Sequence, residues 1–81
     1  MNLLIVQIID ADDSAIVGKY INSITRAPGG YEFHDSIEDA VAEELTFNGI
    51  HHATQSQTLK SSMSRKHMFG FKEIDFLEVQ V

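Results

Sequence analysis

Residues 3–14 read LLIVQIIDADDS, and this stretch decides the fold. Six of its first seven residues are aliphatic, and Gln7 is the exception. A continuous run of this length and β-branched character is typical of a strand that is buried on both faces. Such a strand lies in the middle of a sheet, so the rest of the chain has to cover both of its faces.

Three acids follow this run directly: Asp10, Asp12 and Asp13. Carboxylates at the end of a buried strand can hold Mg²⁺ in phosphoryl-transfer enzymes and hydrolases, and Asp10 and Asp12 have a suitable spacing. The other interpretation is that the acids mark where the strand reaches water and cap the element that follows. We favour the second interpretation, because no downstream motif completes an active site.

The chain has 81 residues, no cysteine and a formal charge of −6. This length predicts one domain over residues 1–81 that is only marginally stable. Without cysteines, no disulfide can add to its stability. Self-association is another common support for small domains, so we expect a homodimer. The apolar N-terminal run follows no basic residue and is too short to cross a bilayer, so we expect a cytoplasmic protein without membrane contact.

The segment 14–26 allows two interpretations. Its apolar residues follow helical spacing, which favours a helix over Ser14–Arg26: Ile16, Val17, Tyr20, Ile21 and Ile24. Gly18 and the β-branched residues are weak helix formers, so the alternative is a hairpin that joins residues 20–25 and 31–34 through a turn at Pro28. We prefer the helix, because periodicity is the stronger signal, and then residues 31–34 form a short separate strand.

The clearest helix is expected over Ser36–Phe47. Asp35 or Ser36 caps it with capping-box spacing, and Asn48-Gly49 ends it. The sequence predicts an apolar stripe toward the core, formed by Ile37, Ala40, Val41 and Leu45. It predicts an acidic face toward water, formed by Glu38, Asp39, Glu43 and Glu44.

The remainder of the chain is less regular. Leu59, Met63 and His67 are four apart, which indicates a helix over about Ser56–Lys66, although a mobile loop fits the polar composition nearly as well. From residue 68 to the end the pattern predicts a strand whose alternation changes phase at Phe76-Leu77. A bulge there would explain the change, and so would cover on both faces, one of them by a second subunit.

Together these elements predict an α+β fold. It has a small sheet of about three strands, with one or two helices packed on one face, and dimerisation would complete it.

The charges are unevenly distributed. Residues 45–72 carry four bases and no acid, whereas the remainder carries all 12 acids and two bases, which gives a part of +4 and a part of −10. Such asymmetry can indicate a surface for a partner. One alternative function is therefore a nucleic-acid-binding accessory protein that uses residues 60–72, but four bases are few and a chain of this net charge repels nucleic acid.

The histidines at positions 34, 51, 52 and 67 have no chelating spacing. The sequence also contains no nucleophile, phosphate-loop or dinucleotide motif. We therefore expect no catalytic residue, no metal ligand and no cofactor.

These features predict a small acidic non-enzymatic protein that binds a larger protein and modulates or inhibits it, as a homodimer. Compact cysteine-free proteins of this size are common among phage-encoded regulators. This comparison is an analogy with a class of proteins and does not rest on a shared motif. We expect the partner to contact the basic segment, where the charge is not balanced locally: Lys60, Arg65, Lys66, His67 and Met68. A small Mg²⁺-dependent phosphoryl-transfer or hydrolase domain that uses Asp10 and Asp12 is the second alternative.

Overall fold

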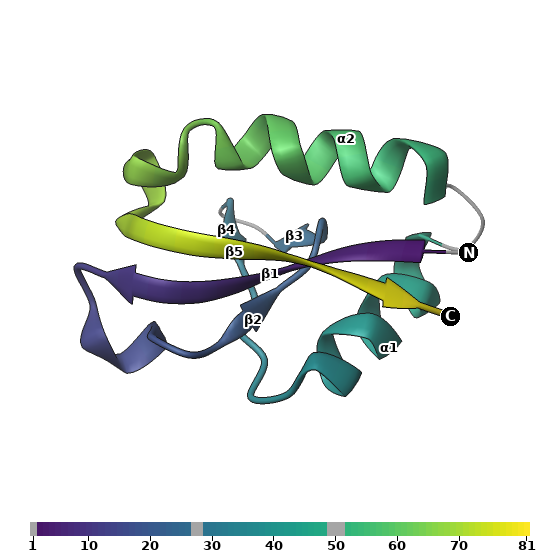
Figure 1. The fold of residues 1–81 in the computed structure, drawn as a ribbon, viewed down its shortest axis with the longest axis horizontal. Helices are drawn as coiled ribbons and strands as arrows, with labels where there is room; N and C mark the ends of the chain where they lie inside the picture. The colour runs from purple at the N-terminus through teal and green to yellow at the C-terminus, as the bar shows by residue number, and fades with distance from the viewer. Residues whose placement is uncertain (1, 27–28, 49–51) are drawn as a thin grey trace.

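The aliphatic N-terminal run forms the central strand, as expected. In a computed structural model that describes residues 2–26, 29–48 and 52–81, this strand spans Asn2–Ala11 (β1). It lies between β2 (Tyr20–Ile21) and β5 (Phe71–Gln80) in a three-stranded sheet of order β2-β1-β5, and both pairings are antiparallel. Two helices complete the arrangement, which confirms the α+β class (Figure 1).

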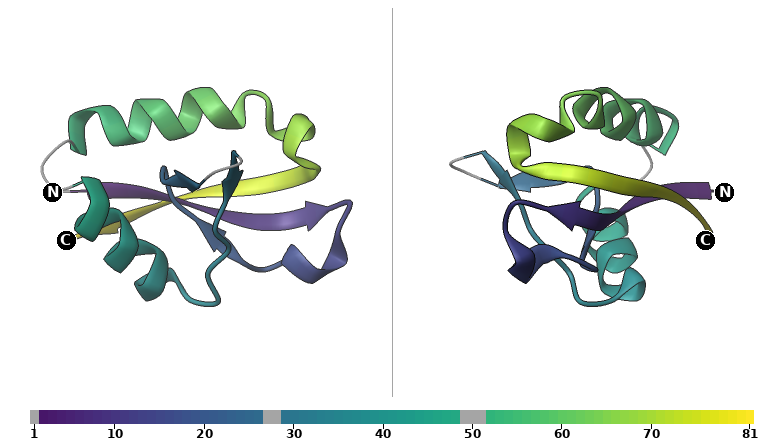
Figure 2. Two further views of the ribbon diagram at one scale, coloured as in Figure 1. Left: turned by 180° about the vertical axis from the view of Figure 1, so that it is seen from behind. Right: turned by 60° about the vertical axis from the view of Figure 1, so that its left-hand side comes forward.

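Both faces of β1 are covered. On one face its buried side chains, Leu4, Val6 and Ile8, share a core with residues of other elements, namely Ile21, Leu59, Met63 and Phe71. Leu3 and Ile5 alternate with these residues, so they point to the opposite face, where they are also fully buried. The helix α2 (His52–Met63) lies on the first face, and α1 (Ile37–Asn48) lies on the other side of β1 (Figures 1 and 2).

The helix expected over Ser14–Arg26 is wrong. This segment contains a single 3-10 turn, η1 (Ser14–Ile16), followed by β2 and by β3 (Thr25–Arg26), which pairs with β4 (Gly30–Tyr31). Gly18 has a φ of +87°, a left-handed conformation that ends the turn and that L side chains rarely adopt. The hairpin alternative was therefore closer, with Tyr20 bridging His34.

The side chain of Asn22 supports this irregular path. Its amide donates to the Ala40 carbonyl (2.8 Å), and its oxygen accepts from the Ile24 N–H (2.9 Å). Local side-chain bonds of this kind compete with helix formation. The expected turn at Pro28 and the expected stop at Gly49 lie outside the described residues.

The helix α1 confirms the strongest helix prediction, and the Ser36 hydroxyl caps it by accepting from the Asp39 N–H (3.2 Å). The predicted faces are right for Ala40, which is buried, and for Glu38 and Asp39, which are exposed, but wrong for three other residues. Glu43 and Glu44, which were assigned to water, are buried, whereas Leu45 is exposed. Tertiary hydrogen bonds to the two carboxylates stabilise this orientation, as described below.

The second helix is also confirmed, and it begins at His52, earlier than expected. Leu59 and Met63 are buried against the sheet, as their spacing predicts. A 3-10 turn, η2 (Lys66–Phe69), then leads into β5, so Met68 and Phe69 precede the strand instead of belonging to it. No helix within the described ranges has the length and apolar character that crossing a membrane requires.

The strand β5 pairs with β1 without interruption from Gln80 to Ile74. The first of the two explanations, a bulge at Phe76-Leu77, is therefore wrong, and the irregularities lie between Ile8 and Ala11 of β1 instead. The change of phase arises because β5 has half-buried apolar residues on both faces: Ile74 on the side of α2, and Leu77 and Val79 on the other.

The strand β2 is too short to pair with the N-terminal half of β1. The side chain of Gln55, from α2, takes its place there. The Leu4 N–H donates to Gln55 Oε1 (3.0 Å), and Gln55 Nε2 donates to the Leu4 carbonyl (2.6 Å). A side-chain amide thus reproduces the two hydrogen bonds of a neighbouring strand, and Gln55 is buried at this position.

We expect the Gln55→Ala variant to lower the free energy of unfolding by about 2–4 kcal/mol, because it leaves the Leu4 backbone groups buried without these partners. Gln57 lies on the exposed side of the same helix, so Gln57→Ala is the matched control and should change stability by less than about 0.5 kcal/mol. Urea unfolding followed by circular dichroism measures both. Equal stabilities of the two variants would contradict the role of Gln55.

Candidate functional site

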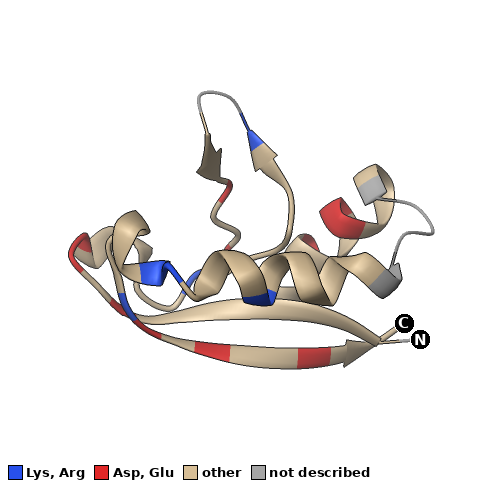
Figure 3. Ribbon diagram, turned by 90° about the horizontal axis from the view of Figure 1, so that it is seen from above, with Lys and Arg blue, Asp and Glu red and all other residues tan. Residues whose placement is uncertain are grey.

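The residues predicted to bind a partner lie on an exposed segment at the end of α2. Lys60, Arg65, His67 and Met68 are exposed, and Lys66 is half-buried. Met68 is unusually accessible for an apolar residue, at 73%. Basic positions therefore mark α2 and the turn after it, whereas acidic positions mark the outer strand β5 (Figure 3).

Lys72, the fourth base of the basic region, lies 3.7 Å from Asp12. An acid therefore already faces one of the four bases on which the nucleic-acid alternative depends.

The acids after β1 take part in a turn and a surface contact. Asp13 precedes η1, and its Oδ1 accepts from the Ala15 N–H (2.9 Å), which is a capping interaction. Asp12 is exposed and faces Lys72. Asp10 is exposed where the β1–β5 register is irregular. These contacts agree with the interpretation that the acids cap the next element and reach water.

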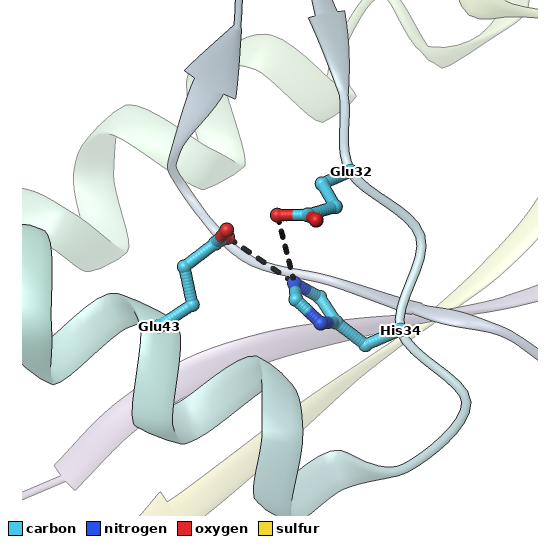
Figure 4. A group of neighbouring side chains, drawn as sticks. All are labelled: Glu32, His34 and Glu43. Carbon is cyan, nitrogen blue, oxygen red and sulfur yellow. Dashed lines mark hydrogen bonds and ion pairs between the residues drawn. The ribbon is translucent and has the colours of Figure 1, made fainter.

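A polar cluster joins α1 to the hairpin of β3 and β4 (Figure 4). His34 Nε2 lies 3.1 Å from Glu43 Oε1 and 4.0 Å from Glu32 Oε2. The guanidinium of Arg26 pairs with both carboxylates, at 2.9 Å from Glu32 Oε2 and in a close contact with Glu43. The cluster thus contains two acids, one permanent cation and one histidine.

Glu32, His34 and Glu43 could supply three ligand atoms to a divalent metal, since these atoms all lie within 4.8 Å of one another. The guanidinium of Arg26 already binds both carboxylates, so a metal ion would have to displace it. As it stands, the cluster is an ion-pair network that ties α1 to the hairpin.

Sequence reasoning missed this cluster for two reasons. The pattern predicts Glu43 on the water-facing side of its helix, and the spacing between histidines leaves out Glu32, which lies two residues before His34. Neither the spacing nor the composition encodes the approach of the two elements, because the β3–β4 hairpin that carries Arg26 was itself only the alternative interpretation.

A second buried network continues from this cluster toward the sheet. Glu44 is fully buried, and its Oε1 accepts from the Ser23 N–H (2.9 Å), the Ser23 hydroxyl (2.7 Å) and Gln55 Nε2 (2.8 Å). Through Gln55 the network reaches the backbone of Leu4. Both helices and the segment after β2 are therefore linked by polar groups on the β2 side of β1.

The opposite side of the sheet differs, because β5 is an edge strand. The backbone groups of Leu4 and Ile8 point away from β5, toward Gln55 and the chain at residues 18 and 19. Backbone direction alternates along a strand, so β1 bonds to β5 through the intervening residues, whose partners are Asp75, Leu77 and Val79. The N–H and C=O groups of Ile74, Phe76 and Glu78 consequently point outward, and no strand in the described ranges pairs with them.

The outer edge of β5 is also acidic and partly apolar. Glu73, Asp75 and Glu78 are exposed and have no ion-pair partner within residues 2–26, 29–48 and 52–81. Phe76 is 44% exposed. Both helices pack mainly against β1, which leaves this edge uncovered.

Comparisons with protein-family models, with curated proteins and with solved structures find no match to this chain.

The polar cluster predicts a specific dependence of stability on pH. Burial raises the pKa of Glu43, but hydrogen bonds from three neighbours outweigh burial and lower this pKa to about 2: Asn22, Arg26 and His34. The pKa is lower in the folded than in the unfolded state. The stabilisation by the ionised Glu43 carboxylate is therefore complete above about pH 4.5 and is lost as the pH falls from there toward 2.

We expect the free energy of unfolding to decrease by up to about 3 kcal/mol over this range, and Glu43→Gln to remove that part of the decrease. Urea unfolding at several pH values between 2.5 and 6 measures the effect. Glu38→Gln, at an exposed position of the same helix, is the control and should keep the wild-type profile. Identical profiles for the Glu43 variant and wild type would exclude this role of Glu43.

Proposed function

We propose that this protein binds a partner protein in the cytoplasm and modulates it, and that the partner adds a strand to the outer edge of β5. The observation that carries this proposal is the length of the edge of β5 with which no strand in the described part of the chain pairs. The strand has 10 residues, and its N–H and C=O groups at Ile74, Phe76 and Glu78 point outward. Edge-strand addition is a common way in which a sheet recognises another chain.

The composition of β5 supports the same proposal. Natural proteins usually protect long sheet edges with charged side chains, proline, a bulge or a covering element, and of these β5 has the charges of Glu73, Asp75 and Glu78. The outer edge of β5 has no proline and is regular from Gln80 to Ile74. An added strand would pair with its backbone and cover Phe76, so one occupant would satisfy both the polar and the apolar parts of the edge.

The basic segment remains a proposed second contact. The residues 60–68 precede β5 directly through η2, and they include the exposed Met68. A partner strand on β5 could extend toward this segment. Lys60, Arg65 and Lys66 would then contribute charge contacts, which adjust the association rate more than the final affinity.

The proposal of a homodimer is separate from β5. Two copies paired along this strand would bring their acids together, so a dimer would need another surface. Sedimentation at tens of micromolar tests it: a species of twice 9.1 kDa supports a homodimer, and a species of 9.1 kDa contradicts it.

The matched pair Glu78→Pro and Glu78→Ala tests the use of β5. Both variants lose the carboxylate, but only proline removes the outward N–H, and the bonds to β1 stay intact in both. We expect immobilised wild type and the Ala variant to retain the same partner from an extract of the native host. The Pro variant should lose it by about tenfold or more, with an unchanged circular dichroism spectrum.

A third variant, with Lys60, Arg65 and Lys66 all changed to Glu, compares the two surfaces. Loss of the partner in this variant but not in Glu78→Pro would assign binding to the basic segment and contradict the proposal for β5. Should proline unfold the chain, Phe76→Lys tests the same edge at an exposed side chain. Retention of the partner by the Lys variant would then contradict the proposal.

A further inference from the structure

The charges along β5 are arranged in rows. Side chains alternate between the two faces of a strand, and Ile74 packs against the core beneath α2. Phe76 and Glu78 therefore lie on the α2 side of the sheet. Glu73 and Asp75 lie on the other side, two residues apart, and both are exposed.

The one base of the strand does not balance these acids. Lys72 Nζ lies 3.7 Å from Oδ1 of Asp12, which follows β1, so its charge is already directed to another carboxylate. The edge thus presents two carboxylates on one face and, on the other, the exposed ring of Phe76 followed by Glu78.

We infer that the occupant of this edge is an extended segment of another protein that carries two Lys or Arg side chains in alternating positions, with an apolar residue between them. This inference rests on the proposed function of β5. Residues two apart on an added strand point to the same face, so the two bases would lie beside Glu73 and Asp75. The apolar residues before and after the base that faces Asp75 would point to the α2 side, beside Ile74 and Phe76.

A second copy of this chain fits the edge poorly. Each copy contributes three acids and one lysine along β5, a charge of −3 + 1 = −2, so a pair of these edges carries −4. Residues opposite one another in an antiparallel pair share a face, which places Glu73 and Asp75 of both copies in one row. Like charges across strands destabilise pairing, whereas bases in the same positions stabilise it.

Synthetic peptides test this inference on the full chain. The basic probe is a capped ten-residue peptide of alternating Lys and Val. A second peptide has Glu for each Lys, and a third repeats the basic sequence with N-methyl groups on alternate amides, which removes the donors of one edge. Amide spectra of the ¹⁵N-labelled protein report where each peptide binds.

We expect the basic peptide to shift the amides of Ile74, Phe76 and Glu78 and to bind at least about tenfold more tightly than the acidic peptide. Its affinity should fall as NaCl is raised from about 50 to 500 mM, because exposed charges are then screened. The N-methylated peptide should not produce these shifts, since it lacks the donors that a strand ladder requires.

The double variant Glu73→Lys/Asp75→Lys should reverse the preference between the basic and acidic peptides. Glu38→Lys/Asp39→Lys is the control with the same change of net charge, at two exposed acids of α1, and should keep the wild-type preference. An equal loss in both double variants would show that net charge alone attracts the peptide, and would overturn the inference.

The remaining outcomes separate the inference from the proposed function. Binding of the acidic peptide to β5 at least as tightly as the basic one overturns the inference but supports strand addition. Shifts that are equally strong with the N-methylated peptide, or no shift in β5 with any peptide, overturn both. Protection of the β5 amides that grows with protein concentration alone identifies a second copy as the occupant and overturns the inference.

Discussion

The fold depends on how the backbone hydrogen bonds of β1 are completed on its β2 side. A central strand buried on both faces leaves no water to satisfy its N–H and C=O groups, so each needs a partner from the chain. The two-residue strand β2 supplies partners near Val6 and Gln7 only. At Leu4 the amide of Gln55 supplies both missing bonds, and this requirement fixes the position of α2 along the strand.

The polar layer around Gln55 explains several features that look unrelated. Gln55 Nε2 also donates to Glu44, which accepts from the backbone and hydroxyl of Ser23, so α1 and the segment after β2 are oriented by the same group. Glu43 is then directed toward Arg26 and His34. Polar side chains therefore close one side of the sheet, while no comparable group closes the outer side of β5 in the described ranges.

The sequence predicts the elements that local interactions stabilise. It does not predict orientations that depend on polar contacts between residues far apart in the chain. The strand at residues 3–9, the helix capped by Ser36 and the Leu59–Met63 stripe follow from periodicity and capping, and all are present. The orientation of Glu43 and Glu44 does not follow from periodicity, because it depends on partners 11 to 21 residues away, such as Ser23 and Gln55. Residues 14–26 were misassigned because their apolar spacing is helical, whereas Gly18 and the turn at Asn22 require an irregular path.

The central claim is that the backbone N–H and C=O groups of β1 are hydrogen-bonded on both sides of the strand, whereas those of β5 are hydrogen-bonded on one side in the described ranges. Residue-resolved amide hydrogen exchange tests this claim most directly. The measurement is made in dilute solution of the wild-type chain. The claim predicts slow exchange at Leu4, together with an alternating pattern along β5 in which Asp75, Leu77 and Val79 exchange slowly while Ile74, Phe76 and Glu78 exchange fast. Fast exchange at Leu4, or uniform protection along β5, would contradict it.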